Sequence, residues 1–283
     1  MTETDFSAWV GRRETRADMI APGPVTRLAA TFDRDDPPPK AGDALPPGWH
    51  WLYFLGASRQ SLLGADGHTT RGEFLPPVDP PRRMWAGGRI GFHADLRIGE
   101  PVERESEIVS ITPKRGRAGA LVFITVRHRV SGPAGLAVEE EHDIVFREPP
   151  RPDAPPPIPP RPPGDGAWER IVHPDPVLLF RFSALTFNGH RIHYDHPYAT
   201  GVEGYPGLVV HGPLIALLLL DLLRRRSPSR PTFFDYRAYA PLFDDAPFAL
   251  RGAPSGDGAA TLWAARPDGG LAMQGTATLG DGA

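Results

Sequence analysis

Apolar residues form two kinds of pattern along the chain, and these predict one long helix and a series of strands. Residues 213–226 begin with an almost uninterrupted run of leucine, isoleucine and alanine, which predicts an α-helix buried on all sides. Pro213 suits the first turn of this helix, and the arginines at residues 224–226 suit its C-terminal end. Fourteen helical residues span about 21 Å, enough for a curved sheet to wrap around them.

Extended segments rich in β-branched and aromatic residues occur in both halves of the chain. Turn sequences such as Ser-Gly-Pro at residues 131–133 separate them, as in antiparallel sheets. A second helix is predicted at residues 49–63, with Gly56 as its weak point. Each half is therefore predicted to be a helix followed by antiparallel strands, an α+β pattern that occurs twice. The predicted strands are residues 89–96, 102–111, 121–130, 138–147, 232–240, 248–252, 259–266 and 270–279.

A proline-rich segment separates the two halves. Residues 149–163 contain ten prolines in fifteen positions, and such a run favours extended polyproline geometry over a helix or a central strand. We therefore predict an N-terminal unit at residues 1–148, a linker at 149–164 and a C-terminal unit at 165–283. Proline-rich runs are also ligands of SH3-type domains, but this sequence gives no signalling context for that function.

Composition excludes several classes of function. The net charge of -3 gives no reason to expect nucleic acid or an anionic membrane as a partner. The chain has no cysteine, which excludes disulfides, thiolate nucleophiles and cysteine-ligated zinc. It shows no signal peptide and no apolar run of about 20 residues, so a cytoplasmic protein without a membrane span is expected.

Histidines gather just before the predicted apolar helix. Four of the ten, namely His190, His193, His196 and His211, lie in this region. Imidazole titrates near neutral pH, and the free amides at a helix N-terminus can stabilise an oxyanion. This combination suits proton transfer next to a carbonyl group. The spacing of the first three also suggests a metal site, but Pro197 interrupts the segment and no His-Glu-x-x-His motif accompanies it, so none is predicted.

Two motifs in this region carry a resemblance to a known family. Residues 182–195 read Phe-Ser-Ala-Leu-Thr-Phe-Asn-Gly-His-Arg-Ile-His-Tyr-Asp, and residues 207–213 read Gly-Leu-Val-Val-His-Gly-Pro. They resemble the MaoC-like hot-dog hydratases, and more closely the branch with type 2 hydroxyacyl-thioester dehydratases and mesaconyl-C4-CoA or itaconyl-CoA hydratases. Residues 49–54 and 82–88 are also typical of that branch. The resemblance implies a tandem, or double, hot-dog of the α+β class, with two antiparallel sheets each wrapped around a central helix.

The resemblance also implies roles for individual residues. The family motif has an aspartate five residues before the histidine, and these positions are Asn188 and His193 here. An asparagine amide can hold a water molecule but cannot accept a proton at neutral pH. We therefore expect His193 to be the acid/base, Asn188 to orient water and the Gly212 N–H to hold the enolate oxygen. The residues expected to bind substrate are His190, His211, Tyr194, Arg82, Trp85 and Gly87.

Other residues keep alternative interpretations. His211 is either a helix cap or part of the site, Asp195 either orients an imidazole or is a solvated turn residue, and His196 is expected in a turn. Coenzyme A phosphates need cationic partners, and the candidates are Arg82, Arg83 and the arginines at residues 224–226. The first half lacks the histidine motif, so it is expected to shape the pocket without catalysing the reaction.

The expected activity is that of a hydratase/dehydratase acting at the α,β-double bond of a short acyl-CoA thioester, of the mesaconyl-C4-CoA or itaconyl-CoA type. No metal or cofactor is expected, because coenzyme A enters as part of the substrate. The alternatives are a dehydratase of 3-hydroxyacyl groups on acyl carrier protein, a hot-dog acyl-CoA thioesterase, and a thioester-binding module without chemistry. Two hot-dog units in one chain already form a pseudo-dimer, so association into a homodimer is optional.

Overall fold

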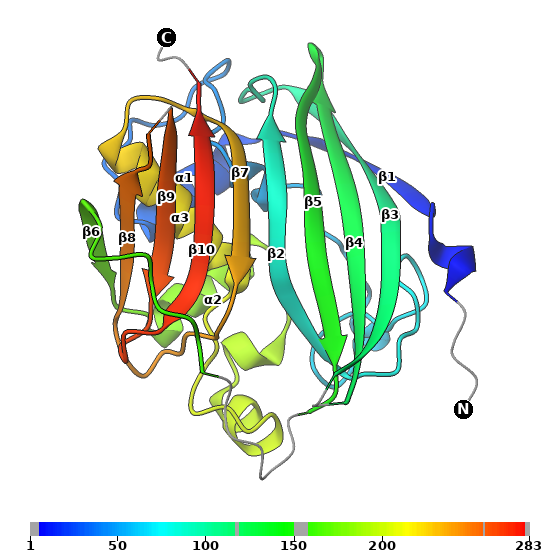
Figure 1. The fold of residues 1–283 in the computed structure, drawn as a ribbon. Helices are drawn as coiled ribbons and strands as arrows, with labels where there is room; N and C mark the ends of the chain where they lie inside the picture. The colour runs from blue at the N-terminus through cyan, green and yellow to red at the C-terminus, as the bar shows by residue number, and fades with distance from the viewer. Residues whose placement is uncertain (1–5, 117–118, 150–157, 257, 281–283) are drawn as a thin grey trace.

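A single antiparallel sheet runs through the molecule (Figure 1). The computed structural model describes residues 6–116, 119–149, 158–256 and 258–280. Within them the strand order is β1-β3-β4-β5-β2-β7-β10-β9-β8-β6, so β2 and β7 join the strands of the first half to those of the second. The strands are β1 (Arg13–Met19), β2 (Arg82–Phe92), β3 (Pro101–Gly116), β4 (Gly119–Gly132), β5 (Gly135–Arg147), β6 (Trp168–Val172), β7 (Pro231–Ala238), β8 (Phe248–Pro254), β9 (Ala259–Ala265) and β10 (Leu271–Leu279).

Helix α3 (Gly212–Arg226) is the core helix that the sequence predicts. It lies against one face of the second half of the sheet and contacts β6, β8, β9 and β10, with β2 from the first half (Figure 1). Residues 214–223 are all buried, which matches their nearly continuous apolar sequence. Each of the eight predicted strands overlaps an observed strand, and most ends agree within three residues. The strand predicted at residues 89–96 is the poorest, because β2 begins seven residues earlier and ends at Phe92, and β3 continues five residues beyond its predicted end.

The prediction of a helix at residues 49–63 is wrong. The chain there forms two 3-10 turns, Trp49–Leu52 and Gln60–Leu62, joined by irregular structure. Gly48 and Phe54 have positive φ angles of 84° and 57°, which interrupt any helix on both sides of the first turn. A Cβ on Gly48 would lie 2.7 Å from Leu217 Cδ2, so tight packing against α3 requires glycine at this position. Tertiary packing therefore overrides the local apolar pattern.

Two helices and two edge strands were not predicted from the sequence. Helix α1 (Pro22–Thr31) packs against helix α2 (Pro176–Leu185), so one helix from each half meets the other. Asp175 caps α2 by accepting a hydrogen bond from the Leu178 N–H at 2.7 Å. The missed strands β1 and β6 are short and lie at the two edges of the sheet.

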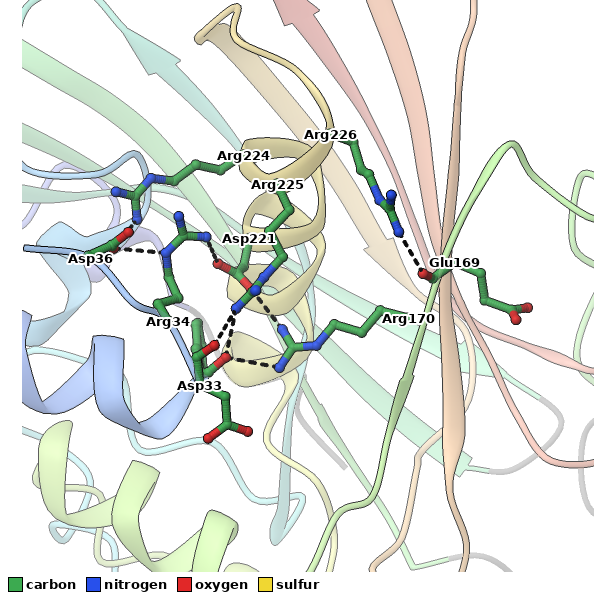
Figure 2. A network of polar contacts seen from close by, with 10 residues as sticks. Asp33, Arg34, Asp36, Glu169, Arg170, Asp221, Arg224, Arg225 and Arg226 are labelled. Carbon is green, nitrogen blue, oxygen red and sulfur yellow. Dashed lines mark hydrogen bonds and ion pairs between the residues drawn. The ribbon is translucent and has the colours of Figure 1, made fainter.

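The C-terminal end of α3 is tied to the first half by a buried carboxylate (Figure 2). Asp221 is 3% exposed and forms ion pairs with Arg34, Arg170 and Arg225, each at 2.7–2.8 Å. Arg224 is also occupied, because it pairs with Asp36 at 2.8 Å. Arg224 and Arg225, two of the candidates for coenzyme A phosphates, are therefore engaged in ion pairs that hold the helix end in place.

The predicted linker lies partly outside the described residues, since 150–157 are among those not described. The division into residues 1–148, 149–164 and 165–283 therefore stays a prediction. Among the described residues, no helix combines the length and apolar character needed to cross a membrane.

Candidate active site

The loop after α2 returns the chain to the N-terminal end of α3. Phe187 has a φ angle of 49°, a left-handed conformation that ends the helix and reverses the chain. The Asn188 N–H then bonds to the Ser183 carbonyl at 2.8 Å. A 3-10 turn, Arg191–His193, follows and directs His193 inward. The motif at residues 182–195 is thus one compact helix-turn unit beside α3.

His193 is buried and fixed in one orientation. Its side chain is 7% exposed, and its Nδ1–H donates to the Val209 carbonyl at 2.6 Å. A carbonyl oxygen can only accept, so this bond fixes the tautomer and leaves Nε2 as a bare acceptor. Burial, and then the neighbouring charge of His190, lower the pKa of His193 to about 3. The imidazole is therefore neutral at physiological pH and is in the form a base requires.

His211 connects this base to the start of α3. It is the N-cap residue of α3, is 1% exposed and stacks on His193 with ring centroids 3.6 Å apart. Its Nε2 lies 2.8 Å from the Ser183 hydroxyl, and burial keeps its pKa well below the ordinary value. His211 thus occupies the N-cap position without capping the helix through its side chain, and it is a direct neighbour of the predicted base.

Gly212 follows immediately and begins the helix. Among the described residues, no hydrogen bond is formed by its N–H, as expected for the first amide of a helix. A Cβ at this position would lie 3.3 Å from the Trp85 Cβ, so Trp85 from β2 packs closely on the helix start. The first half of the chain therefore borders the N-terminal end of α3.

Asn188 lies on the same loop with its amide partly available. Its Oδ1 accepts the His190 N–H at 3.0 Å, while no hydrogen bond to a described residue is made by its Nδ2. The side chain is only partly buried. An amide held through its oxygen and free at its nitrogen can donate to a water molecule or to substrate.

Sequence reasoning missed two residues here, Asp66 and His68 from the first half. Asp66 Oδ2 lies 3.0 Å from His68 Nδ1, and the His68 ring lies 4.1 Å from the ring of His190. The Arg191 N–H bonds to the Asp66 carbonyl at 2.9 Å, and a Cβ on Gly67 would lie 1.9 Å from the Gly189 carbonyl oxygen. The two loops are therefore in direct backbone contact. The only local signal was a histidine two residues after an aspartate in a glycine-containing turn.

His190 lies between these two loops. Burial lowers its pKa to about 3, with His68 as the next cause, and its ring centroid is 5.3 Å from that of His193. Asp66, His68 and His190 place their ligand atoms within 4.8 Å of one another, as do His128, Glu140 and His142 in β4 and β5. Both groups could hold a metal ion by spacing, so the expectation of a metal-free enzyme stays a prediction.

The other predicted residues do not all join this group. Tyr194 is exposed, and its hydroxyl donates to the Gly189 carbonyl at 2.9 Å. Arg82 is ion-paired with Glu203 at 3.1 Å, and Gly87 allows close pairing of β2 with β7, since a Cβ there would lie 2.4 Å from the Tyr236 carbonyl oxygen.

Among the described residues, no hydrogen bond or ring contact joins Asp195 or His196 to the imidazoles of the site. Asp195 accepts hydrogen bonds from the Arg191 guanidinium and the Tyr198 N–H instead of an imidazole. His196 is exposed and begins the helical segment that leads into the π-helix Tyr198–Val202, so it does not lie in the predicted turn.

Comparison with known proteins identifies the family. The profile of the family described as hydroxyacyl-thioester dehydratase type 2 matches residues 48–244. The chain is 52% identical to the mesaconyl-C4-CoA hydratase of Chloroflexus aurantiacus over 99% of its own length and 100% of that protein.

Solved structures agree on the fold. A MaoC-like dehydratase from Phytophthora capsici superimposes with a TM-score of 0.70 at 12% identity, covering 96% of this chain and 97% of that one. A Mycobacterium tuberculosis protein described as a double hot-dog gives a TM-score of 0.57 at 14% identity, covering 96% of each chain. The predicted α+β double hot-dog is thereby confirmed, with its two halves merged into one sheet. The chain belongs to the type 2 hydroxyacyl-thioester dehydratase family and is a hydro-lyase of acyl thioesters.

Proposed function

We propose that this protein hydrates the α,β-double bond of a short dicarboxylic monothioester of coenzyme A, such as mesaconyl-C4-CoA or itaconyl-CoA. The observation that carries this substrate class is the 52% identity, over essentially the whole chain, with a mesaconyl-C4-CoA hydratase. The arrangement of His193, His211 and Gly212 supports the reaction type independently, because it offers a neutral base next to an unpaired helix amide.

In this proposal His193 is both the base and the acid. Its Nε2 takes a proton from water, while the water oxygen bonds to the β-carbon and the double-bond electrons move onto the thioester oxygen. The imidazolium then returns the proton to the α-carbon, and the thioester carbonyl re-forms. The low pKa of the resting imidazole rises during the step, because an enolate forms beside it and favours the charged ring.

The Gly212 N–H stabilises the enolate oxygen. The first amide of α3 has no intrahelical partner and carries the positive end of the helix dipole, so it favours negative charge. Glycine lets the thioester approach the backbone closely. Asn188 positions the water through its Nδ2 group. The same groups used in the opposite order would dehydrate a 3-hydroxyacyl thioester.

A dehydratase of 3-hydroxyacyl groups on acyl carrier protein is the second candidate, and the family match favours it. A thioesterase would need a carboxylate to activate water for attack on the carbonyl, and position 188 holds an amide instead. No metal or cofactor has a role in the proposed steps, and coenzyme A enters with the substrate. A cytoplasmic location, optional homodimer formation and a non-catalytic first half remain proposals.

The test is an absorbance assay of enoyl-thioester consumption with purified protein. The panel contains mesaconyl-C4-CoA, itaconyl-CoA, crotonyl-CoA and a crotonyl group on acyl carrier protein. The proposal expects the highest kcat/KM on a dicarboxylic CoA ester. Preference for the carrier-protein substrate would favour the second candidate, and release of free coenzyme A without hydration would favour a thioesterase.

A further inference from the structure

Arg83 projects from the face of the sheet that bears the site. It is paired in register with Phe146 of β5, and directly opposite residues of paired strands project from the same face. Phe146 packs in a cluster with Val78, and the Arg71 guanidinium lies 4.8 Å above its ring. These contacts come from the segment that also contains Asp66 and His68. Trp85, two residues further along β2, packs on Gly212 from this same face.

The guanidinium of Arg83 has no partner in the part of the chain that the structure describes. No hydrogen bond or ion pair reaches it, and the side chain is exposed to solvent. Its neighbours differ in this respect. Arg82 pairs with Glu203, and Arg71 donates to the carbonyls of Val78, Pro80 and Pro81. Arg83 is therefore a cation placed at the site without a counter-ion.

The charged groups that act on Arg83 belong to segments of the candidate site. Desolvation is the main cause that lowers the pKa of Arg83, followed by repulsion from Arg71, while Asp66 opposes the change. Arg83 is in turn one of the groups that lower the pKa of His190. Arg71, Asp66 and His190 are thus the charged or titratable neighbours of a guanidinium whose side chain is exposed to solvent.

We propose that Arg83 binds the free carboxylate of a dicarboxylic acyl-thioester substrate and selects for that substrate class. The inference rests on the proposed function, because a monothioester of an unsaturated dicarboxylic acid keeps one carboxylate near the double bond. A guanidinium can bind a carboxylate through two parallel hydrogen bonds, which fixes orientation as well as charge. The phosphates of coenzyme A offer similar chemistry, but the pantetheine arm separates them from the thioester, whereas Arg83 lies on the same face of β2 as Trp85, which packs on Gly212.

The first experiment compares Arg83→Gln with the wild-type protein on mesaconyl-C4-CoA and crotonyl-CoA, which share the enoyl thioester but differ in the carboxylate. We expect kcat/KM on mesaconyl-C4-CoA to fall about 100-fold, mainly through KM, with less than a threefold change on crotonyl-CoA. Arg83→Lys should recover part of the loss. Arg129→Gln, which removes an exposed arginine paired with Glu139, is the matched control and should change neither substrate. An equal loss on both substrates, or no loss, would overturn the proposal.

A second experiment needs no turnover. Titration calorimetry measures the binding of succinyl-CoA, butyryl-CoA and free coenzyme A. The two esters have no double bond and coenzyme A has no acyl group, so none of the three can be hydrated. The wild-type protein should bind succinyl-CoA at least tenfold more tightly than butyryl-CoA, and Arg83→Gln should abolish that difference while leaving free coenzyme A unaffected. Equal binding of both esters by the wild type, or weaker binding of free coenzyme A by the variant, would contradict the proposal. Because this experiment measures binding alone, it tests the role of Arg83 even if the hydratase assay detects no turnover.

Discussion

The imidazole rings of His193 and His211 lie face to face, with centroids 3.6 Å apart and planes inclined by 18°. Two imidazolium rings at this distance would repel each other, and burial lowers both pKa values. The pair is therefore held neutral by the fold. A base that stays unprotonated beside a helix amide follows from this packing and from the bond to the Val209 carbonyl.

The first prediction concerns stability at acid pH. His128, His190, His193 and His211 all have lowered pKa values in the fold, with burial as the first cause. Between about pH 6.5, the pKa of an unfolded histidine, and about pH 3, the unfolded chain binds more protons than the folded one. Stability should thus be complete above pH 6.5 and fall as the pH drops, by up to about 1.4 kcal/mol per histidine and pH unit.

Thermal melts between pH 7.5 and pH 4.5 measure this effect. His211→Asn should flatten the dependence of Tm on pH, whatever it does to the absolute Tm. His196→Asn removes an exposed histidine and should leave the slope unchanged. A wild-type Tm that does not change across this range would contradict the neutral packing of these rings.

A second prediction concerns Asn188, the only asparagine in the chain. Asn188→Asp introduces the carboxylate that the MaoC motif has at this position. That charge favours the protonated imidazole and should raise the pKa of His193, so the acid limb of the kcat/KM profile should move to higher pH. Asn188→Ala should lose about 10- to 100-fold in kcat, because nothing then holds the water. Full activity of the alanine variant would exclude the proposed role.

A third prediction concerns the buried carboxylate at the far end of α3. Asp221→Asn removes the buried charge that Arg34, Arg170 and Arg225 share, and only Arg34 keeps another carboxylate partner, Asp36. Breaking a buried ion pair in this way costs about 3 kcal/mol or more. Urea unfolding measures the loss. Asp268→Asn breaks an exposed pair with Arg266 and should cost less than about 1 kcal/mol. Since Asp221 lies about 14 Å along the helix from Gly212, the folded variant should keep its kcat.

The sequence predicts the parts of the fold that have strong periodicity. Helix α3 and the long strands β3, β4 and β5 bury regular apolar patterns, and their predicted ends are at most five residues from the observed ones. Strand β1 was missed because its sequence, Arg-Glu-Thr-Arg-Ala-Asp-Met, is mostly polar and is held by pairing with β3. The start of helix α2 could have been predicted from Asp175 as N-cap and Pro176 as the first helical residue. It was missed because its last residues were interpreted only as part of the motif at residues 182–195.

The same contrast holds within the site. Asn188, His193 and Gly212 belong to two local motifs, so they could be named from the sequence. Asp66 and His68 reach the loop only because Gly67 touches Gly189, and no local pattern encodes such a long-range contact. Arg83 was named only as a phosphate candidate, since the sequence does not show which arginines have partners.

The most direct test of the account is the kcat/KM of His193→Ala for the hydration of mesaconyl-C4-CoA. The account predicts a loss of about 1,000-fold, with the variant still folded by circular dichroism and His196→Ala unchanged as a matched control. A folded His193→Ala protein that keeps its activity within tenfold of the wild type would contradict the assignment of His193 as the acid/base.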